Sequence, residues 1–322
     1  MKRRTFSAAG LATLVWSGRG RAQSDYPSRV LRLVVPFAPG GATAVTARLV
    51  AQRLSDGLKQ QVLVENRPGG GSIVGTDFVA KAAPDGYTLA MVANSGIAPG
   101  PLMRASMPYD ALADFTHLVL VGSFPNGLVV RADHPARSMA ELVALARARP
   151  GVLNYSSAGV GSSGFLSGEL LKQKAGVDIV HIPYKGSGPA TADLLGGQLD
   201  AMFDGLVTAT SHVRSGRMRL LAVTSAERAR TCPEVPSTNE VVPGVVGAAW
   251  FGVSAPARLP QAIAERLSGE ILKVLALPEV KTRLGDIGMT VRAGGPREYL
   301  AHIAAENNLY GPLIRAAGIR ID

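Results

Sequence analysis

Cysteine is almost absent from this chain, because Cys232 is the single cysteine among 322 residues. A disulfide within the chain is therefore excluded, and so is a metal site built from cysteines. Nor does any pair of His, Asp or Glu stand at metal-ligand spacing on one face of a predicted helix. We therefore expect no bound metal, and we interpret Cys232 as an inert loop residue.

Aromatic residues are also scarce, at 5% of the chain, and the basic residues are scattered along it. Nucleic-acid binding typically needs a basic stripe with interleaved aromatic side chains, so the sequence argues against a nucleic-acid partner. The formal net charge is +10, but residues 1–24 hold five basic residues and no acid, which leaves +5 for the remainder. An excess of this size weakly favours anionic ligands.

No hydrophobic run reaches the ~20 residues that a membrane-spanning helix needs. Residues 1–24 instead have the features of an export signal: a basic start, an apolar stretch over 6–17, and Ala22-Gln23-Ser24 at the expected cleavage point. Residues 3–6 resemble the twin-arginine signature, although an ordinary secretory signal fits equally well. We expect a soluble mature protein in the periplasm.

The rest of the chain alternates short apolar runs with segments of helical apolar spacing. The expected strands are 30–35, 61–66, 87–92, 154–156, 179–182, 199–204 and 250–254. The expected helices are 43–59, 73–83, 138–149, 165–175, 187–196, 260–277, 278–284 and 296–317. Strands separated by helices pair in parallel, because each crossover takes a helix's length of residues, so the predicted fold class is α/β.

Two crossings of the chain are expected to divide it into two domains. The first lies between the extended segments 115–121 and 127–131, which residues 123–126 separate, and residues 219–224 lead back. The predicted division is an export signal over 1–24, domain 1 over 25–125 plus 225–322, and domain 2 over 126–224. Two crossings make a hinge, so a site between the domains should close on binding.

Two turns rich in small residues, 36–43 and 156–164, each follow a predicted strand and open a predicted helix. Small residues let the backbone approach a ligand, and the helix that follows aims its free N–H groups at a negative charge. We interpret both turns as anion cradles that face each other across a cleft. This position, beyond the carboxyl ends of the strands, is where ligands bind in open α/β sheets.

Signatures of an enzyme are weak. Residues 159–164 match the GxGxxG dinucleotide pattern, but the next strand, 178–184, lacks the acid at its far end that binds a ribose hydroxyl, so we expect no cofactor. No G-x-S-x-G nucleophile turn is present, and the five histidines show no informative spacing. Asp204 could be a general base or an acceptor for a loop or ligand, and Lys185 could bind an anion or be a solvated lysine. Because no acid, base and nucleophile occur together, we expect a binding protein; an enzyme acting on a small carboxylate through Asp204 and Lys185 is the alternative.

Several stretches, in order along the chain, carry a family resemblance. They are YPSR (26–29), VVPFAPGG (34–41), VENRPG (64–69), AKAAPDGYTL (80–89), HIPYKG (181–186), DLLGGQ (193–198) and WFG (250–252). On these stretches the chain, from Tyr26 to its end, resembles the Bug-type receptors, which are the extracytoplasmic solute-binding proteins of tripartite tricarboxylate transporters.

The resemblance implies a two-domain, type II periplasmic-binding-protein fold, a Venus flytrap with the ligand in the cleft between the domains. It also implies no enzymatic activity, a small organic carboxylate as ligand, capture by hinge closure, and the membrane permease components of a tripartite transporter as partners. We expect a monomer. A ligand-sensing module that serves a signalling partner remains an open alternative.

Carried over by position, the pocket loops of the family supply the predicted ligand-binding residues of this chain. They are Pro39, Gly40, Gly41, Ala42, Thr43, Gly70, Gly71, Ser72, Asn94, Ser95, Ser157, Ala158, Gly159, Gly161, Ser162, Ser163, Tyr184, Lys185, Gly186, Phe203 and Asp204. Two positions depart from the family pattern: Ala44 stands where an Asp is usual, and Phe165 where a His is frequent. Both changes remove polarity beside the predicted site, so we hypothesise a less polar or bulkier carboxylate, such as an aromatic acid.

Overall fold

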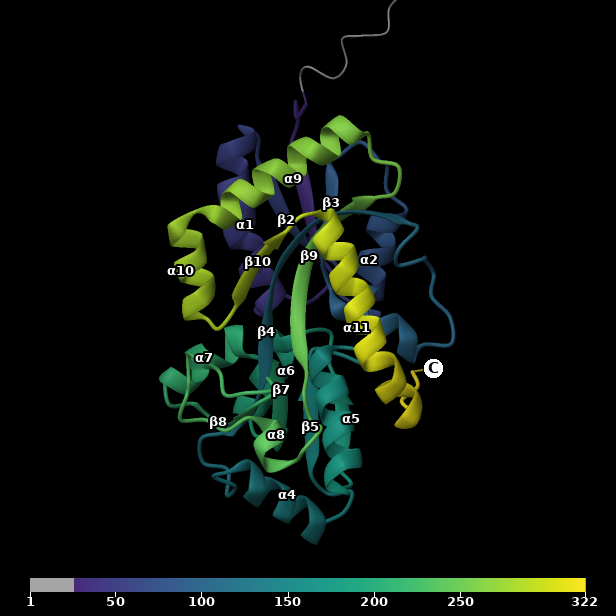
Figure 1. Ribbon diagram of the computed structural model, residues 1–322. Helices are drawn as coiled ribbons and strands as arrows, with labels where there is room; N and C mark the ends of the chain where they lie inside the picture. The colour runs from purple at the N-terminus through teal and green to yellow at the C-terminus, as the bar shows by residue number, and fades with distance from the viewer. Residues whose placement is uncertain (1–25, 322) are drawn as a thin grey trace, which may run out of the picture.

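Two α/β lobes share one sheet in the computed structural model, which describes residues 26–321 (Figure 1). The predicted export signal, residues 1–24, lies outside the described residues. The sheet has ten strands, eight of them in the order β2-β1-β3-β9-β4-β7-β5-β6, while β8 and β10 also pair with β4. Within residues 26–321, no helix combines the length and the apolar character needed to cross a membrane. The α/β class predicted from the sequence is confirmed.

The first lobe begins with three parallel strands, β1 (Leu31–Val35), β2 (Val62–Asn66) and β3 (Thr88–Ala93). Helices α1 (Ala42–Leu58) and α2 (Ile73–Ala80) form the crossovers between them. Three short helical turns accompany these elements: η1 (Gly70–Ser72), α3 (Asn94–Ile97) and η2 (Gly100–Met103). Strand and helix alternate here as the apolar spacing of the sequence predicts.

The C-terminal part of the chain completes the first lobe. Strand β9 (Ala248–Pro256) lies antiparallel between β3 and β4, and β10 (Thr290–Gly294) pairs with the other edge of β4. The helices of this part are α9 (Gln261–Ala276), α10 (Pro278–Asp286) and α11 (Pro296–Ala316).

The second lobe repeats the arrangement with parallel strands β5 (Asn154–Ser157), β6 (Val180–Pro183) and β7 (Ala201–Gly205). Strand β8 (Met218–Val223) pairs antiparallel with β4. The helices are α4 (Met139–Ala148), α5 (Ser163–Ala175), α6 (Ser187–Leu195), α7 (Leu206–Arg214) and α8 (Thr238–Val241). Helix α7, which the sequence analysis did not predict, follows β7 directly, without a loop that would have marked its start.

Strand β4 (Phe115–Arg131) runs unbroken through both lobes, whereas the sequence analysis expected two extended segments separated by residues 123–126. Residues 115–125 pair with β9, and residues 126–130 pair with β7. Pro125 is the last residue of the ladder with β9, a position at which a missing N–H is tolerated. The first crossing between the lobes is therefore a continuous strand.

Residues 225–247 pack on the second lobe, although the sequence analysis assigned them to domain 1. Cys232 packs with Leu206 and Val223, and Val242 and Val245 join the hydrophobic core of the second lobe. The chain therefore returns to the first lobe only at β9, because the apolar side chains of this segment find their buried surface beside β8. The rest of the domain division stays a prediction.

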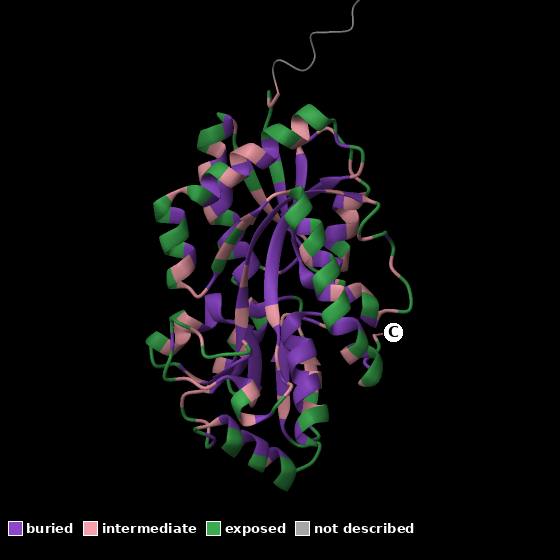
Figure 2. Ribbon diagram, viewed as in Figure 1, coloured by how far each residue is buried: buried purple, intermediate pink, exposed green. Residues whose placement is uncertain are grey.

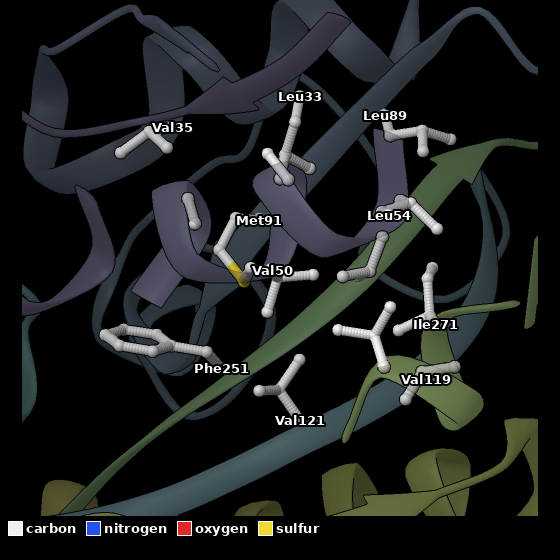
Figure 3. Close-up of a cluster of buried hydrophobic side chains, with 14 of the residues drawn as sticks. Leu33, Val35, Val50, Leu54, Leu89, Met91, Val119, Val121, Phe251 and Ile271 are labelled. Carbon is white, nitrogen blue, oxygen red and sulfur yellow. The ribbon is translucent and has the colours of Figure 1, made fainter. Parts of the chain in front are cut away.

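The inner strands of the first lobe, β1, β3 and β9, are buried on both faces over most of their length. Leu33 faces the core formed with Val50 of α1 and Ile271 of α9 (Figure 3), whereas its neighbour Val34 faces a second cluster with Tyr299 of α11. This alternation follows from the two-residue period of a strand. Figure 2 shows the central strands β3, β4 and β9 largely buried, with exposed residues on the outer faces of the helices.

Helix α11 packs on both lobes (Figure 1). Tyr299 and Ile303 contribute to the same cluster as Trp250 in the first lobe, whereas Tyr310 and Ile314 contribute to the core of the second lobe. The C-terminal helix therefore couples the two lobes independently of β4.

One acid on this helix should control how stability depends on pH. Glu306 accepts a hydrogen bond from Trp250 Nε1 over 3.2 Å, and burial raises the pKa of Glu306 to about 7. Between the unfolded pKa, ~4.3, and this value the folded protein holds more protons, so its stability falls as pH rises and levels off above pH 7. The variant Glu306→Gln keeps an oxygen that can accept from Trp250 but does not titrate. We predict that its free energy of unfolding, relative to that of wild type, increases by about 3 kcal/mol as pH rises from 4.5 to 7.5.

Denaturant unfolding of both proteins across that pH range measures the difference. The buried His117 has its pKa lowered to about 4, so its protonation destabilises the folded state below pH 6.5. This contribution is common to both proteins and cancels in the difference. If the free energies of unfolding of the two proteins changed with pH in parallel, Glu306 would not be the cause of the pH dependence.

Candidate functional site

A cavity of about 50 Å³ lies between the two lobes. Sixteen residues from both lobes line it, and none of them has a charged side chain. They are Phe37, Gly41, Ala42, Thr43, Ala93, Asn94, Ser95, Phe124, Asn126, Ala158, Ser162, Ser163, Ser187, Gly205, Ala249 and Phe251.

Five helices begin at this cavity, and their first or capping residues line it. Helices α1 and α3 of the first lobe start at Ala42 and Asn94, and helices α5, α6 and α7 of the second lobe start at Ser163, Ser187 and Leu206. The first N–H groups of a helix have no acceptor within the helix, and the helix dipole adds partial positive charge there. Only α5 has a side-chain cap, from Ser162, whose Oγ accepts from Phe165 N. The arrangement is built to receive a negative charge.

The two cradle turns predicted from the sequence meet at this cavity. Eight of the predicted residues line it: Gly41, Ala42, Thr43, Asn94, Ser95, Ala158, Ser162 and Ser163. The others lie outside the lining: Pro39, Gly40, Gly70, Gly71, Ser72, Ser157, Gly159, Gly161, Tyr184, Lys185, Gly186, Phe203 and Asp204. Ligand contact by any of these residues stays a prediction.

Several of the residues outside the lining form the contact between the lobes. Ala38 N of the first lobe donates to Lys185 O of the second over 2.8 Å. A Cβ added to Gly188 would lie 2.2 Å from Pro39 O, and one added to Gly71 would lie 1.9 Å from Val160 O. Because the backbones approach this closely, the glycines permit the lobes to close over the cavity.

Other predicted residues hold the cavity walls in place. Ser157 Oγ accepts from Gly159 N over 3.2 Å and lies 2.9 Å from His181 Nε2, which fixes the turn before α5. Burial lowers the pKa of His181 to about 4, so this histidine is neutral near pH 7. Across the cavity, Ser72 Oγ lies 2.8 Å from Ser95 Oγ and orients it.

The pair of residues considered for catalysis does not line the cavity. Asp204 is buried, and its Oδ2 accepts from Thr208 Oγ1 over 2.5 Å; burial raises its pKa, opposed by hydrogen bonds led by that from Thr208. The Lys185 side chain is exposed, and neither residue lines the cavity. Tyr184 donates its hydroxyl to Asp193 of α6 instead of facing the cavity. Among residues 26–321 there is also no group of three or more His, Cys, Asp or Glu residues that could hold a metal.

The two departures from the family pattern do not reach the cavity. Ala44 is fully buried in the core of the first lobe, and the Phe165 ring packs 4.9 Å from the ring of His181. The apolar part of the cavity wall comes from Phe37, which lies in the predicted turn 36–43, and from Phe124 and Phe251, which the sequence analysis did not predict. The hypothesis that Ala44 and Phe165 favour a less polar or bulkier carboxylate stays a prediction.

Asn126, Ser187 and Gly205 are further lining residues that sequence reasoning missed. Ser187 directly follows the predicted turn 184–186, so the start of the helix there was the available signal. Asn126 and Gly205 are paired across β4 and β7, and no local pattern reveals such a pair.

Comparison with known proteins agrees with this architecture. The model of the tripartite tricarboxylate transporter family receptor, TctC, matches residues 46–319. The structure titled "R. palustris Rpa4515 with adipate" is 36% identical, with a TM-score of 0.88, and the match covers 92% of this chain and 99% of that one. Periplasmic binding protein BugD is 32% identical, with a TM-score of 0.88 and coverage of 92% and 99%.

A third structure is that of MatC (Rpa3494) from Rhodopseudomonas palustris with bound malate. It is 31% identical, with a TM-score of 0.86, and the match covers 90% of this chain and 100% of that one. The resemblance and the flytrap fold inferred from the sequence are confirmed by these matches, which span nearly the whole described chain. The chain belongs to the tripartite tricarboxylate transporter receptor family, TctC.

Proposed function

We propose that this protein is a periplasmic receptor that captures a small organic carboxylate between its lobes and delivers it to the membrane permease components of a tripartite transporter. The observation that carries the proposal is the convergence of five helix N-termini on a cavity without charged side chains. The relatives crystallised with adipate and with malate support a carboxylate ligand.

The chemistry of the cavity favours an anion held by neutral groups. Backbone N–H groups at Ala42 and Ser163 and the hydroxyls of Thr43, Ser95 and Ser162 can donate to carboxylate oxygens. Each charge-assisted hydrogen bond contributes ~1.5–3 kcal/mol net, so a few of them support tight binding without a lysine or arginine.

Capture requires that the lobes open and close. The contact between Ala38 N and Lys185 O and the close approach of Gly188 to Pro39 join the lobes at the rim of the cavity. Such contacts belong to a closed state, and an open state must break them to admit the ligand. The ligand favours closure because it binds donors from both lobes at once.

The location and the oligomeric state are part of the same proposal. Receptors of this family are periplasmic, and residues 1–24 have the composition of the signal that would export this chain. All sixteen lining residues belong to one chain, so a monomer suffices for binding.

Calorimetric titration of the mature protein with a panel of organic acids, a neutral sugar and a cationic amine tests the function. We predict one site per chain, binding of at least one carboxylate, and no binding of the sugar or the amine. The free N–H groups repel the cationic amine, and the sugar has no negative charge for them to bind. Mass spectrometry of the ligand that copurifies with the protein should give an organic acid. Tight binding of a cation with no carboxylate bound would overturn the proposal.

Closure is tested by Gly188→Ala. Gly188 lies in helix α6, where alanine is favoured over glycine, yet the added Cβ would clash with Pro39 O across the cleft. We predict at least tenfold weaker carboxylate binding and a melting temperature no lower than that of wild type.

The matched control is Gly269→Ala in helix α9, where an added Cβ meets nothing within 4 Å. This variant should keep the wild-type affinity and melt at the same or a slightly higher temperature. Equal affinities in both variants would show that the ligand is bound without closure at residues 39 and 188.

A further inference from the structure

Asn126 stands out among the residues of the cavity because its amide nitrogen lacks a hydrogen-bond partner. Nine buried polar side-chain atoms within residues 26–321 have no such partner. Of the residues that carry them, Asn126 alone lines the cavity, and it is 2% exposed. The atom is Nδ2, a donor.

The orientation of this carboxamide is fixed by its surroundings. Its Oδ1 accepts from Ser163 Oγ over 3.2 Å, and its backbone N donates to Thr224 Oγ1 over 2.9 Å. Asn126 also pairs with Gly205 in the sheet, on strand β4. While Oδ1 accepts from Ser163, the free N–H groups of Nδ2 are directed away from the Ser163 hydroxyl.

A buried donor without an acceptor costs free energy, and an acceptor that arrives with the ligand removes that cost. Asn126 belongs to the second-lobe wall of the cavity, whereas the turn at Gly41 and Thr43 belongs to the first lobe. Phe124 and Phe251, whose ring centroids are 4.9 Å apart, line the same cavity. The cavity thus offers donors from both lobes together with hydrocarbon contact.

We propose that Asn126 determines specificity by donating from Nδ2 to a second oxygen of the bound acid. The receptor then selects carboxylates that carry a further hydroxyl, carbonyl or carboxylate oxygen over acids whose remainder is hydrocarbon alone. This inference rests on the proposed function, since it assumes that an organic acid occupies the cavity.

The experiment uses two pairs of acids with equal carbon number, succinate with butyrate and adipate with hexanoate. Their dissociation constants are measured by calorimetry for wild type, Asn126→Leu and Asn126→Ser. Wild type should prefer a diacid, and both variants should bind that diacid about ten- to a hundredfold more weakly, as expected for the loss of one charge-assisted hydrogen bond. Affinity for the corresponding monoacid should change less than threefold, so the preference collapses.

The control is Asn66→Leu, which removes a carboxamide that already has a partner. Asn66 Nδ2 donates to Phe37 O over 2.8 Å, and Asn66 does not line the cavity. This variant should keep the wild-type ratio of diacid to monoacid affinity even where both affinities fall. If Asn126 had only a structural role, its substitution would weaken the binding of the diacid and of the monoacid equally, and the ratio of the two affinities would not change.

The outcomes separate the two proposals. If wild type binds neither these four acids nor any carboxylate of the calorimetric panel, the proposed function fails. If wild type binds them and both Asn126 variants keep the diacid preference, or if wild type prefers the monoacids, this inference fails while the function stands. If either variant does not fold, a crystal structure of wild type with adipate decides. The inference requires an oxygen of adipate within hydrogen-bond distance of Asn126 Nδ2. Water alone at that position would overturn it.

Discussion

The free N–H groups of five helix N-termini are the feature on which the rest of this structure depends. Parallel strands in each lobe deliver their helices to the same edge of the sheet, and the two lobes turn these edges toward each other. Five partly positive ends around one small cavity repel one another unless something negative lies between them. The closed arrangement and the capture of an anion are therefore two aspects of one electrostatic balance.

The parts of this site that obey local rules could be predicted from the sequence. A strand, a turn of small residues and a helix start follow one another at residues 31–58 and at 154–175, and such a turn exposes its N–H groups wherever it occurs. Both turns do line the cavity. Most strands and helices were equally predictable, because the apolar period of two or 3.6 residues is itself local, whereas α7 and β10 were not predicted.

The parts that depend on tertiary structure could not be predicted. Phe124, Asn126 and Phe251 reach the cavity because β4 and β9 run past it from one lobe to the other, and nothing adjacent in the sequence marks this. Ala44 shows how close a residue can come to the cavity in sequence without lining it. It directly follows Thr43, which lines the cavity, but each step along a helix rotates the side chain by about 100°, so Ala44 faces the core.

The absence of charged side chains from the cavity has a consequence for the transport cycle. A pocket that neutralised its guest with lysine or arginine would hold a counter-ion for it, whereas amides and hydroxyls leave the negative charge of the guest uncompensated by any ion. Loading and unloading then involve no proton exchange with the walls, and separation of the lobes is enough for release. Any cation or proton that balances the charge of the guest therefore comes from outside the cavity.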